Sequence, residues 1–106
     1  DGLFTNYWWD ASRLASSAEL AGPQRAHDVY AGVDCFARGP VGYTAGPGCR
    51  SHCLAAREAG VSLALFAPGW SLECGEASCK PLQQAAESDR KFWLDLGVEQ
   101  AYRSEL

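Results

Sequence analysis

Val61-Ser62-Leu63-Ala64-Leu65-Phe66-Ala67 is the stretch that decides the fold, because it is a nearly continuous apolar run of strand length. Such a run is typical of a parallel strand that is buried on both faces. Pro68-Gly69-Trp70 follows, and a Pro-Gly pair interrupts regular secondary structure. The sequence therefore predicts a buried parallel strand over 61–67.

Two earlier runs, at 3–8 and 29–36, also have strand character. Successive side chains of a strand point to opposite faces of its sheet. The run at 29–36 therefore has two distinct faces, with Val29, Ala31, Val33 and Cys35 opposed to Tyr30, Gly32, Asp34 and Phe36. We expect the first of these sets to face covering helices.

A helical pattern follows each run, and each pattern has a recognisable end. Asp10 is a suitable N-cap for the first helix, and Gly22-Pro23, Gly60 and Gly97 are suitable stops for the three. The predicted inward faces are Leu14, Ala15, Ala18 and Ala21; then Leu54, Ala55 and Ala59; then Phe92, Trp93 and Leu96.

Alternation of strands and helices predicts βαβ units with a parallel sheet. The runs start at 3, 29 and 61, a spacing that matches a (β/α)8 barrel of about 250 residues. We therefore predict an α/β fold, a fragment of a TIM barrel with about three βα units and parallel strands. The partial barrel domain is predicted over 1–97, and the C-terminal segment 98–106 is unassigned. The alternative is a small three-layer α/β domain.

Composition excludes several classes of function. Hydrophobic residues make up 47% of the 106 residues, as in ordinary globular sequence. The net charge of −4 and the lack of a Lys/Arg cluster argue against a nucleic-acid partner. No apolar run approaches the length that spans a bilayer, so no membrane partner is expected. The glycine-rich loop at 38–48 matches no nucleotide-binding fingerprint, and no cofactor is expected.

The five cysteines form no regular framework. An odd number of thiols without such a framework fits a reduced, cytosolic protein, and no secretory signal pattern is recognised. Cys49, His52 and Cys53, together with Cys74 and Cys79, fit a zinc site only loosely. We therefore expect scattered thiols and no metal. His27 and His52 lack triad partners and are expected at the surface.

Aromatic and polar residues follow the predicted strands, at the barrel edge where active sites lie. Aromatic rings stack on the apolar faces of sugars, and Asn, Asp, Glu and Arg hydrogen-bond sugar hydroxyls. This pattern favours a carbohydrate ligand. The candidate contacts are Asn6, Trp8, Asp34, Arg38, Trp70 and Glu73. Each also has a structural alternative. Trp8, Trp9 and Trp70 would be loop packing, Asp34 would pair with Arg38, and Glu73 would be solvated.

Four blocks together resemble the glycoside hydrolase family 85 of endo-β-N-acetylglucosaminidases. Asp1-Gly2-Leu3-Phe4-Thr5-Asn6-Tyr7 is similar to the family's DG-hydrophobic-FTNY segment, and 29–39, VYAGVDCFARG, to its DVYVGVDVFARG strand. The run at 63–70, LALFAPGW, is similar to the family's ALFAPGW strand, and 89–93, DRKFW, to its DKFW segment. The blocks occur in the family's order, so the domain at 1–97 is expected to be a partial family 85 barrel.

The resemblance implies an enzyme that cuts the GlcNAc-β-1,4-GlcNAc core of N-glycans by substrate-assisted catalysis. The substrate's own acetamide attacks the anomeric carbon, an Asn orients that acetamide, and a Glu two residues later acts as acid and base. The family places this Asn-x-Glu pair upstream of the FTNY strand. Asn6 is followed by Tyr7-Trp8 and does not supply the pair. No catalytic residue is therefore assigned within this chain.

The implied partner is an N-glycan or glycoprotein, and the implied location is the cytosol. Tyr7 is expected near the substrate acetamide, with the six candidates above as weaker sugar contacts. We expect a fragment of the enzyme that is inactive alone. The alternatives are a non-catalytic carbohydrate-binding remnant or pseudo-enzyme, and an unrelated α/β binding module whose tryptophans are all core.

Overall fold

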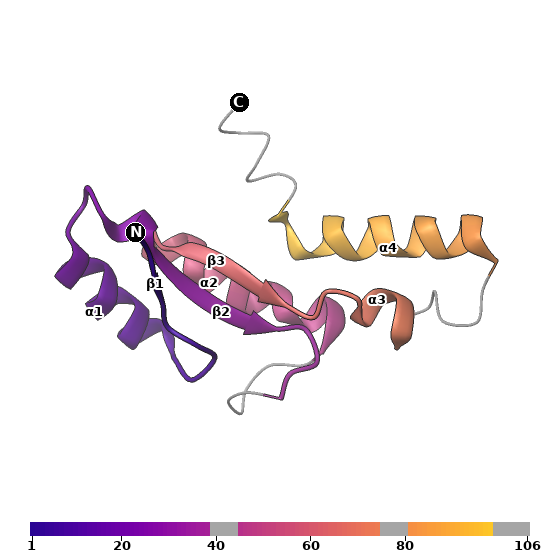
Figure 1. Ribbon diagram of the computed structural model, residues 1–106, viewed down its shortest axis with the longest axis horizontal. Helices are drawn as coiled ribbons and strands as arrows, with labels where there is room; N and C mark the ends of the chain where they lie inside the picture. Colours follow the sequence, from indigo (N-terminus) through magenta and orange to yellow (C-terminus); the bar gives the residue numbers. More distant parts are fainter. Residues whose placement is uncertain (39–44, 75–80, 99–106) are drawn as a thin grey trace.

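The computed structural model describes residues 1–38, 45–74 and 81–98, and it has an α/β architecture (Figure 1). Three strands alternate with helices along the chain. The elements are, in order, β1 (Leu3–Phe4), α1 (Ala11–Ala21), η1 (Ala26–Asp28), β2 (Val29–Asp34), η2 (Gly46–Cys49), α2 (Arg50–Ala59), β3 (Ser62–Phe66), α3 (Trp70–Glu73) and α4 (Leu82–Leu96).

The three strands form one parallel sheet in the order β1-β2-β3. The register pairs Phe4 with Tyr30 and Asp34 with Phe66. Parallel neighbours in sequence order are the outcome that βαβ connections predict. The predicted α/β class with parallel strands is therefore confirmed.

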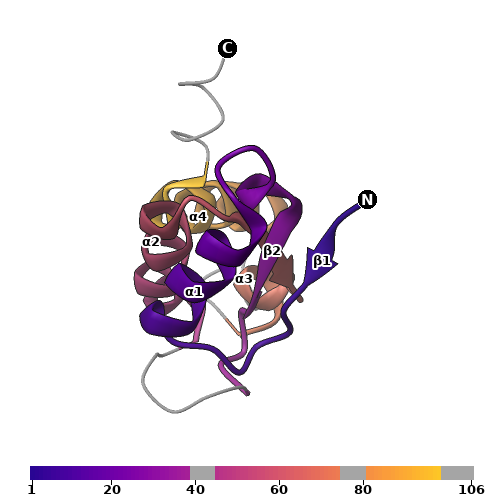
Figure 2. The same ribbon diagram turned by 90° about the vertical axis from the view of Figure 1, so that its left-hand side faces the viewer.

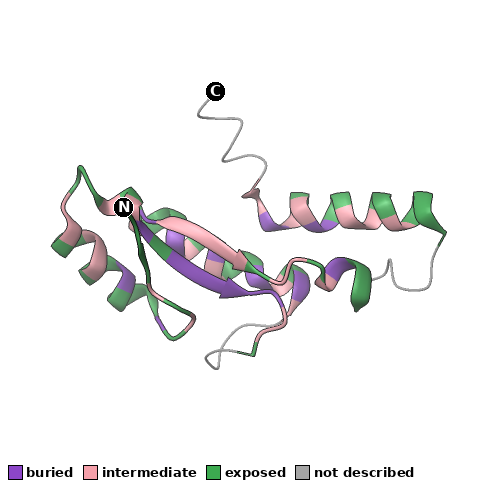
Figure 3. Cartoon of the chain, viewed as in Figure 1, coloured by how far each residue is buried: buried purple, intermediate pink, exposed green. Residues whose placement is uncertain are grey.

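Helices α1 and α2 pack on one face of this sheet, and within the described residues no element covers the other face (Figure 2). Val29, Ala31 and Val33 of β2 are at most 5% exposed in the core beneath the helices, as their alternation predicted. Figure 3 shows β2 as the most buried strand, flanked by less buried neighbours. The sheet thus has one packed face and one open face.

The predicted helix ends are confirmed by their backbone geometry. The Asp10 carboxylate accepts a hydrogen bond from the Arg13 backbone N–H at 2.8 Å, which caps α1. Gly60 and Gly97 take left-handed conformations at the ends of α2 and α4. Phe92 and Leu96 are buried on α4, as predicted.

The helical faces of α1 and α2 differ in part from the prediction. Ala15 is exposed, because only Leu14 of that turn reaches the core. On α2 the buried residues are Cys53 and Ala56, whereas Leu54 is 37% exposed. Ala55 and Ala59 pack against the core as predicted, so only Leu54 departs from the predicted face, and the buried Cys53 lies there in its place.

The strands are shorter than predicted, and local backbone turns end the first two. Asn6 has φ +64°, which bends the chain away two residues after β1. The Asp34 carboxylate accepts the Phe36 backbone N–H, and Ala37 has φ +54°, so β2 stops at Asp34. The predicted ends at residues 8 and 36 are wrong for this reason.

The expectation that β3 is buried on both faces is also wrong. Leu63 and Leu65 pack toward the core, whereas Phe66 is 48% exposed. β3 is an edge strand of the described sheet, and Phe66 lies on the open face of that sheet. An apolar run therefore marks a strand here without implying that both of its faces are covered.

Candidate functional site

The C-terminal ends of the strands carry the residues singled out from the sequence. Asp34 is the last residue of β2 and is only 4% exposed, although it faces the open side of the sheet. Its carboxylate accepts Arg38 Nε at 2.8 Å and Arg38 Nη2 at 3.1 Å, a bidentate pair. The backbone N–H groups of Phe36 and Arg38 also donate to it, at 3.0 and 3.3 Å.

This environment keeps Asp34 ionised. The hydrogen-bonded Arg38 guanidinium lowers the pKa of the carboxyl, burial opposes that shift, and the two backbone donors reinforce it. The same contact with Asp34 raises the pKa of Arg38. The structural alternative for Asp34, a pair with Arg38, is therefore what the structure shows, and the pair presents a fixed guanidinium at the strand ends.

Arg38 and Tyr7 both contact Phe66, although they come from different βα loops. The Arg38 guanidinium carbon lies 5.3 Å from the centre of the Phe66 ring and 4.8 Å from that of Phe36. The Tyr7 ring lies 5.7 Å from Phe66 and 5.8 Å from Phe4. We call Phe4, Tyr7, Phe66 and the Asp34–Arg38 pair the aromatic–arginine cluster.

Sequence reasoning singled out Tyr7, Asp34 and Arg38 but missed Phe4 and Phe66. The register of the strands would have identified both residues. Phe66 pairs with Asp34 across the sheet, so their side chains share the open face. Phe4 pairs with Tyr30 in the same way.

Asn6 and Trp8 flank Tyr7 and lie at the surface. The Asn6 side-chain oxygen accepts the Tyr7 backbone N–H at 2.9 Å. Trp8 is 64% exposed, and its carbonyl oxygen accepts Arg13 Nη1 at 3.3 Å. Exposure leaves the Trp8 ring available for stacking, so its predicted role as a sugar contact stays a prediction.

Trp70 and Glu73 both lie on α3, and the two have different surroundings. The charge of Glu73 is near enough to Arg38 to help raise its pKa, together with Asp34 and Tyr7. Trp70 stacks on Phe92 of α4 at 5.9 Å and fills the space above Gly46. Gly46 has φ +63°, and a Cβ there would lie 2.2 Å from the indole. The packing alternative for Trp70 is therefore the arrangement observed.

Trp9 and His52 form a separate, more buried contact. Trp9 is 7% exposed, and its ring lies 4.8 Å from the His52 imidazole on α2. Burial lowers the pKa of that imidazole. His52 is therefore half-buried against an indole, and its expected surface position is wrong, whereas His27 is exposed.

Four cysteines lie within the described residues, and Cys74 is the exposed one among them. Cys35, Cys49 and Cys53 are buried, and burial raises the pKa of the Cys53 thiol to about 11. Across residues 1–38, 45–74 and 81–98, no group of three His, Cys, Asp or Glu side chains is arranged to hold a metal ion. Cys79, part of the zinc pattern considered, lies outside these ranges, as does most of the glycine-rich loop.

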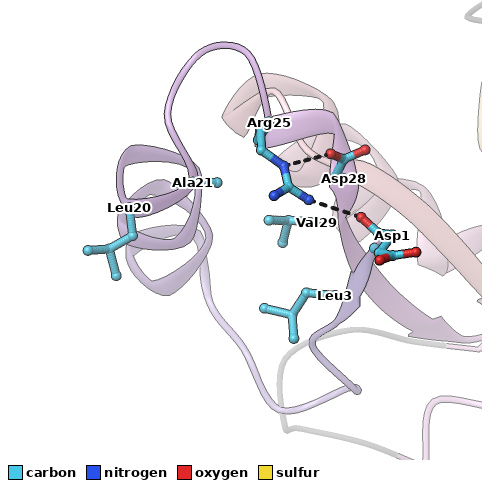
Figure 4. Close-up of a pocket in the computed structure, with 8 residues that line it drawn as sticks. Asp1, Leu3, Leu20, Ala21, Arg25, Asp28 and Val29 are labelled. Atoms are coloured by element: carbon cyan, nitrogen blue, oxygen red, sulfur yellow. Dashed lines mark hydrogen bonds and ion pairs between the residues drawn. The ribbon is translucent and has the colours of Figure 1, made fainter.

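A pocket of about 400 Å³ lies at the opposite end of the strands, beside the free edge of β1 (Figure 4). Arg25 bridges Asp28 and the Asp1 carbonyl at its rim, at 3.0 and 3.2 Å. Its apolar side chains come from β1, α1 and β2, and they are Leu3, Leu20, Ala21 and Val29. The N-terminal end of parallel strands is the end associated with stability, so the candidate site remains the cluster at the C-terminal ends.

A helix-covered parallel sheet with aromatic and charged side chains at its C-terminal edge defines an α/β protein of the class that binds ligands at that edge. Within this class, the chain belongs to glycosyl hydrolase family 85, whose family model matches residues 1–105. Within the described residues, no helix has the length and apolar character needed to cross a membrane.

Three relatives illustrate the match. The cytosolic endo-beta-N-acetylglucosaminidase of Gallus gallus is 50% identical over 70 residues, which is 66% of this chain and 9% of that protein. The protein of that name from Homo sapiens is 44% identical over 93 residues, or 88% of this chain and 12% of the relative. Cytosolic endo-beta-N-acetylglucosaminidase 1 of Arabidopsis thaliana is 43% identical over 74 residues, or 69% and 10%.

The chain therefore spans about a tenth of the length of these relatives. No solved structure matches it significantly.

Proposed function

We propose that this chain is the substrate-binding part of an endo-β-N-acetylglucosaminidase that hydrolyses the GlcNAc-β-1,4-GlcNAc core of N-glycans in the cytosol. The family match over 1–105 and the names of the relatives support this activity. The three βα units would then be part of a (β/α)8 barrel, with the partial barrel domain over 1–97 and the open face of the sheet toward the barrel interior.

The observation that carries the proposal is the aromatic–arginine cluster at the C-terminal strand ends. Tyr7 and Phe66 offer ring faces, and Arg38, held in place by the buried Asp34, offers charged hydrogen-bond donors beside them. An aromatic face next to planar polar groups suits a sugar, which has apolar C–H faces and hydroxyl edges. An N-glycan or glycoprotein is the corresponding partner.

The proposed mechanism is substrate-assisted. The acetamide oxygen of the substrate attacks its own anomeric carbon, and a Glu of an Asn-x-Glu pair protonates the leaving sugar and then activates water. Asn6 is the only asparagine of this chain, and Trp8 stands two residues after it. The pair must come from the remainder of the protein, and Tyr7 is proposed to contact the acetamide that it orients.

Tyr7→Phe in the full-length enzyme tests this assignment. Removing the phenolic hydroxyl keeps the ring contacts with Phe4 and Phe66, so folding should be little affected. We expect kcat on an N-glycosylated peptide to fall at least tenfold, because a group that touches the reacting acetamide is lost. A wild-type rate with good substrate would remove Tyr7 from the site. The matched control is Tyr30→Phe, on the open face but away from the strand ends.

A second candidate is a carbohydrate-binding remnant or pseudo-enzyme, because the aromatic–arginine cluster suits a sugar whether or not a catalytic acid is present. The two candidates differ in the complete reading frame. An Asn-x-Glu at the end of a strand preceding Asp1 supports the enzyme. A complete frame without such a pair supports sugar binding without hydrolysis, which binding calorimetry with N,N′-diacetylchitobiose would detect.

A further inference from the structure

Beyond the Thr5–Tyr30 hydrogen bonds, the segment 6–9 after β1 is held to β2 at Gly32. The Gly32 backbone N–H donates to the Asn6 carbonyl at 3.0 Å. The Gly32 carbonyl accepts the indole N–H of Trp9 at 2.9 Å, and this bond is buried. Both hydrogen-bonding groups of one residue are therefore used by the segment 6–9.

Gly32 has to be glycine for this arrangement to form. A Cβ at this position would lie 2.5 Å from the Asn6 carbonyl oxygen and 2.8 Å from the Phe4 ring. The first of these is a backbone atom, so a side chain would displace the turn itself. The close approach of the segment 4–6 to β2 therefore requires a glycine at position 32.

The two anchors bracket Tyr7 and Trp8. On the Asn6 side, a left-handed backbone with φ +64° turns the chain, and the Asn6 amide oxygen accepts the Tyr7 N–H. On the other side, the indole of Trp9 is wedged between Gly32 and the His52 ring of α2. Tyr7 is directed by this geometry onto Phe4 and Phe66, whereas Trp8 points into solvent.

We infer that Gly32 and Trp9 form a clasp that positions Tyr7 for catalysis, without either residue touching the substrate. The inference rests on the proposed role of Tyr7 at the acetamide. A misplacement of a reacting group's partner by about 1 Å costs on the order of 100-fold in rate, so a clasp of this kind has kinetic consequences. The two residues are positioning residues and not catalytic ones.

A double-mutant cycle in the full-length enzyme separates positioning from general packing. Trp9→Phe removes the N–H donor and keeps an aromatic ring against His52. If Trp9 acts through Tyr7, Trp9→Phe lowers kcat about tenfold with KM within about twofold. The double variant Tyr7→Phe/Trp9→Phe should then have the kcat of Tyr7→Phe alone. Trp93→Phe on α4, the matched substitution at a half-buried tryptophan, should leave both constants within about twofold.

The outcomes distinguish the clasp from the proposed function. The clasp is overturned if the kcat losses of the two single variants multiply in the double variant, or if Trp9→Phe has the wild-type kcat. In either case, a lowered kcat for Tyr7→Phe still supports the proposed function. A wild-type kcat for Tyr7→Phe overturns both. If Trp9→Phe does not fold, replacing Trp9 with β-(3-benzothienyl)alanine removes only the N–H donor and gives the same test. Gly32→Ala should reproduce the kcat loss of Trp9→Phe. A Gly32→Ala enzyme with the wild-type kcat would count against the clasp.

Discussion

At the residue scale, Asp34 shows how a buried carboxylate is tolerated on an otherwise open sheet face. Four N–H donors surround it, two from the Arg38 guanidinium and two from the backbone. A buried charge without such partners would be costly, so these bonds account for its low exposure. They also fix the loop after β2, because the backbone donors belong to the residues that turn away from the sheet.

Asp34→Asn should therefore destabilise the protein by about 1.5–3 kcal/mol, the range for hydrogen bonds to charged groups. The pKa of Asp34 is lowered in the folded state. Its contribution is thus fully present above the unfolded pKa of 3.8 and is lost as pH falls through the lower folded value. The difference between wild type and variant, measured by urea denaturation of the full-length protein, should be largest near neutral pH and shrink below pH 3.8.

Asp95→Asn is the matched control, since Asp95 forms an exposed pair with Lys91 at 2.9 Å. Such surface pairs contribute at most about 1 kcal/mol. Equal stability and activity of wild type and Asp34→Asn at every pH would mean that the charge of Asp34 contributes nothing to folding or function.

At the element scale, a left-handed residue follows the end of each of the three strands in the described part of the chain. These residues are Asn6 after β1, Ala37 after β2 and Ala67 after β3, with φ of +64°, +54° and +56°. Left-handed backbone is unfavourable for residues with a Cβ, and it is tolerated where surrounding structure imposes it, often at functional sites. All three lie at the edge that carries the aromatic–arginine cluster, so the turns direct the loops that carry its side chains.

Ala67→Gly should stabilise the protein by about 0.5–1 kcal/mol, because relief of the left-handed strain exceeds the entropy that glycine adds to the unfolded chain. The control, Ala15→Gly on the exposed side of α1, should destabilise by about the same amount. Chemical denaturation of the full-length variants measures both. Losses of the same sign and size at the two positions would show that the Ala67 backbone carries no such strain.

The ends of helices and the inward faces of strands are the features that sequence patterns predict well. Alternation in 29–36 placed Val29, Ala31 and Val33 against the helices, and Gly60 and Gly97 ended their helices, because these signals are local. The clustering of Tyr7 with Phe66, and the hydrogen bond from Trp9 to Gly32, depend on strand register and loop course. Strand register and loop course are set by contacts between residues that are distant in the sequence. The periodicity of a segment gives no information about such contacts.

At the scale of the whole molecule, the sheet has one face packed by α1 and α2 and one face that no described element covers. Phe4, Tyr30 and Phe66 are 52%, 41% and 48% exposed on that face. Contiguous exposed apolar surface of this kind marks a contact region. In the proposed barrel, the rest of the protein would enclose it.

The isolated 106-residue chain should therefore expose this face, bind a hydrophobic dye such as ANS, and self-associate at micromolar concentration. Tyr30→Thr, which keeps a strand-favouring residue but removes the ring, should shift the association to higher concentration. Leu82→Gln is the control, because Leu82 is 87% exposed at the start of α4, outside the sheet. Sedimentation velocity of the three chains measures the association. A dye-silent monomer would mean that the chain closes the open face by itself, and the packed three-layer alternative to a barrel segment would then be the better description.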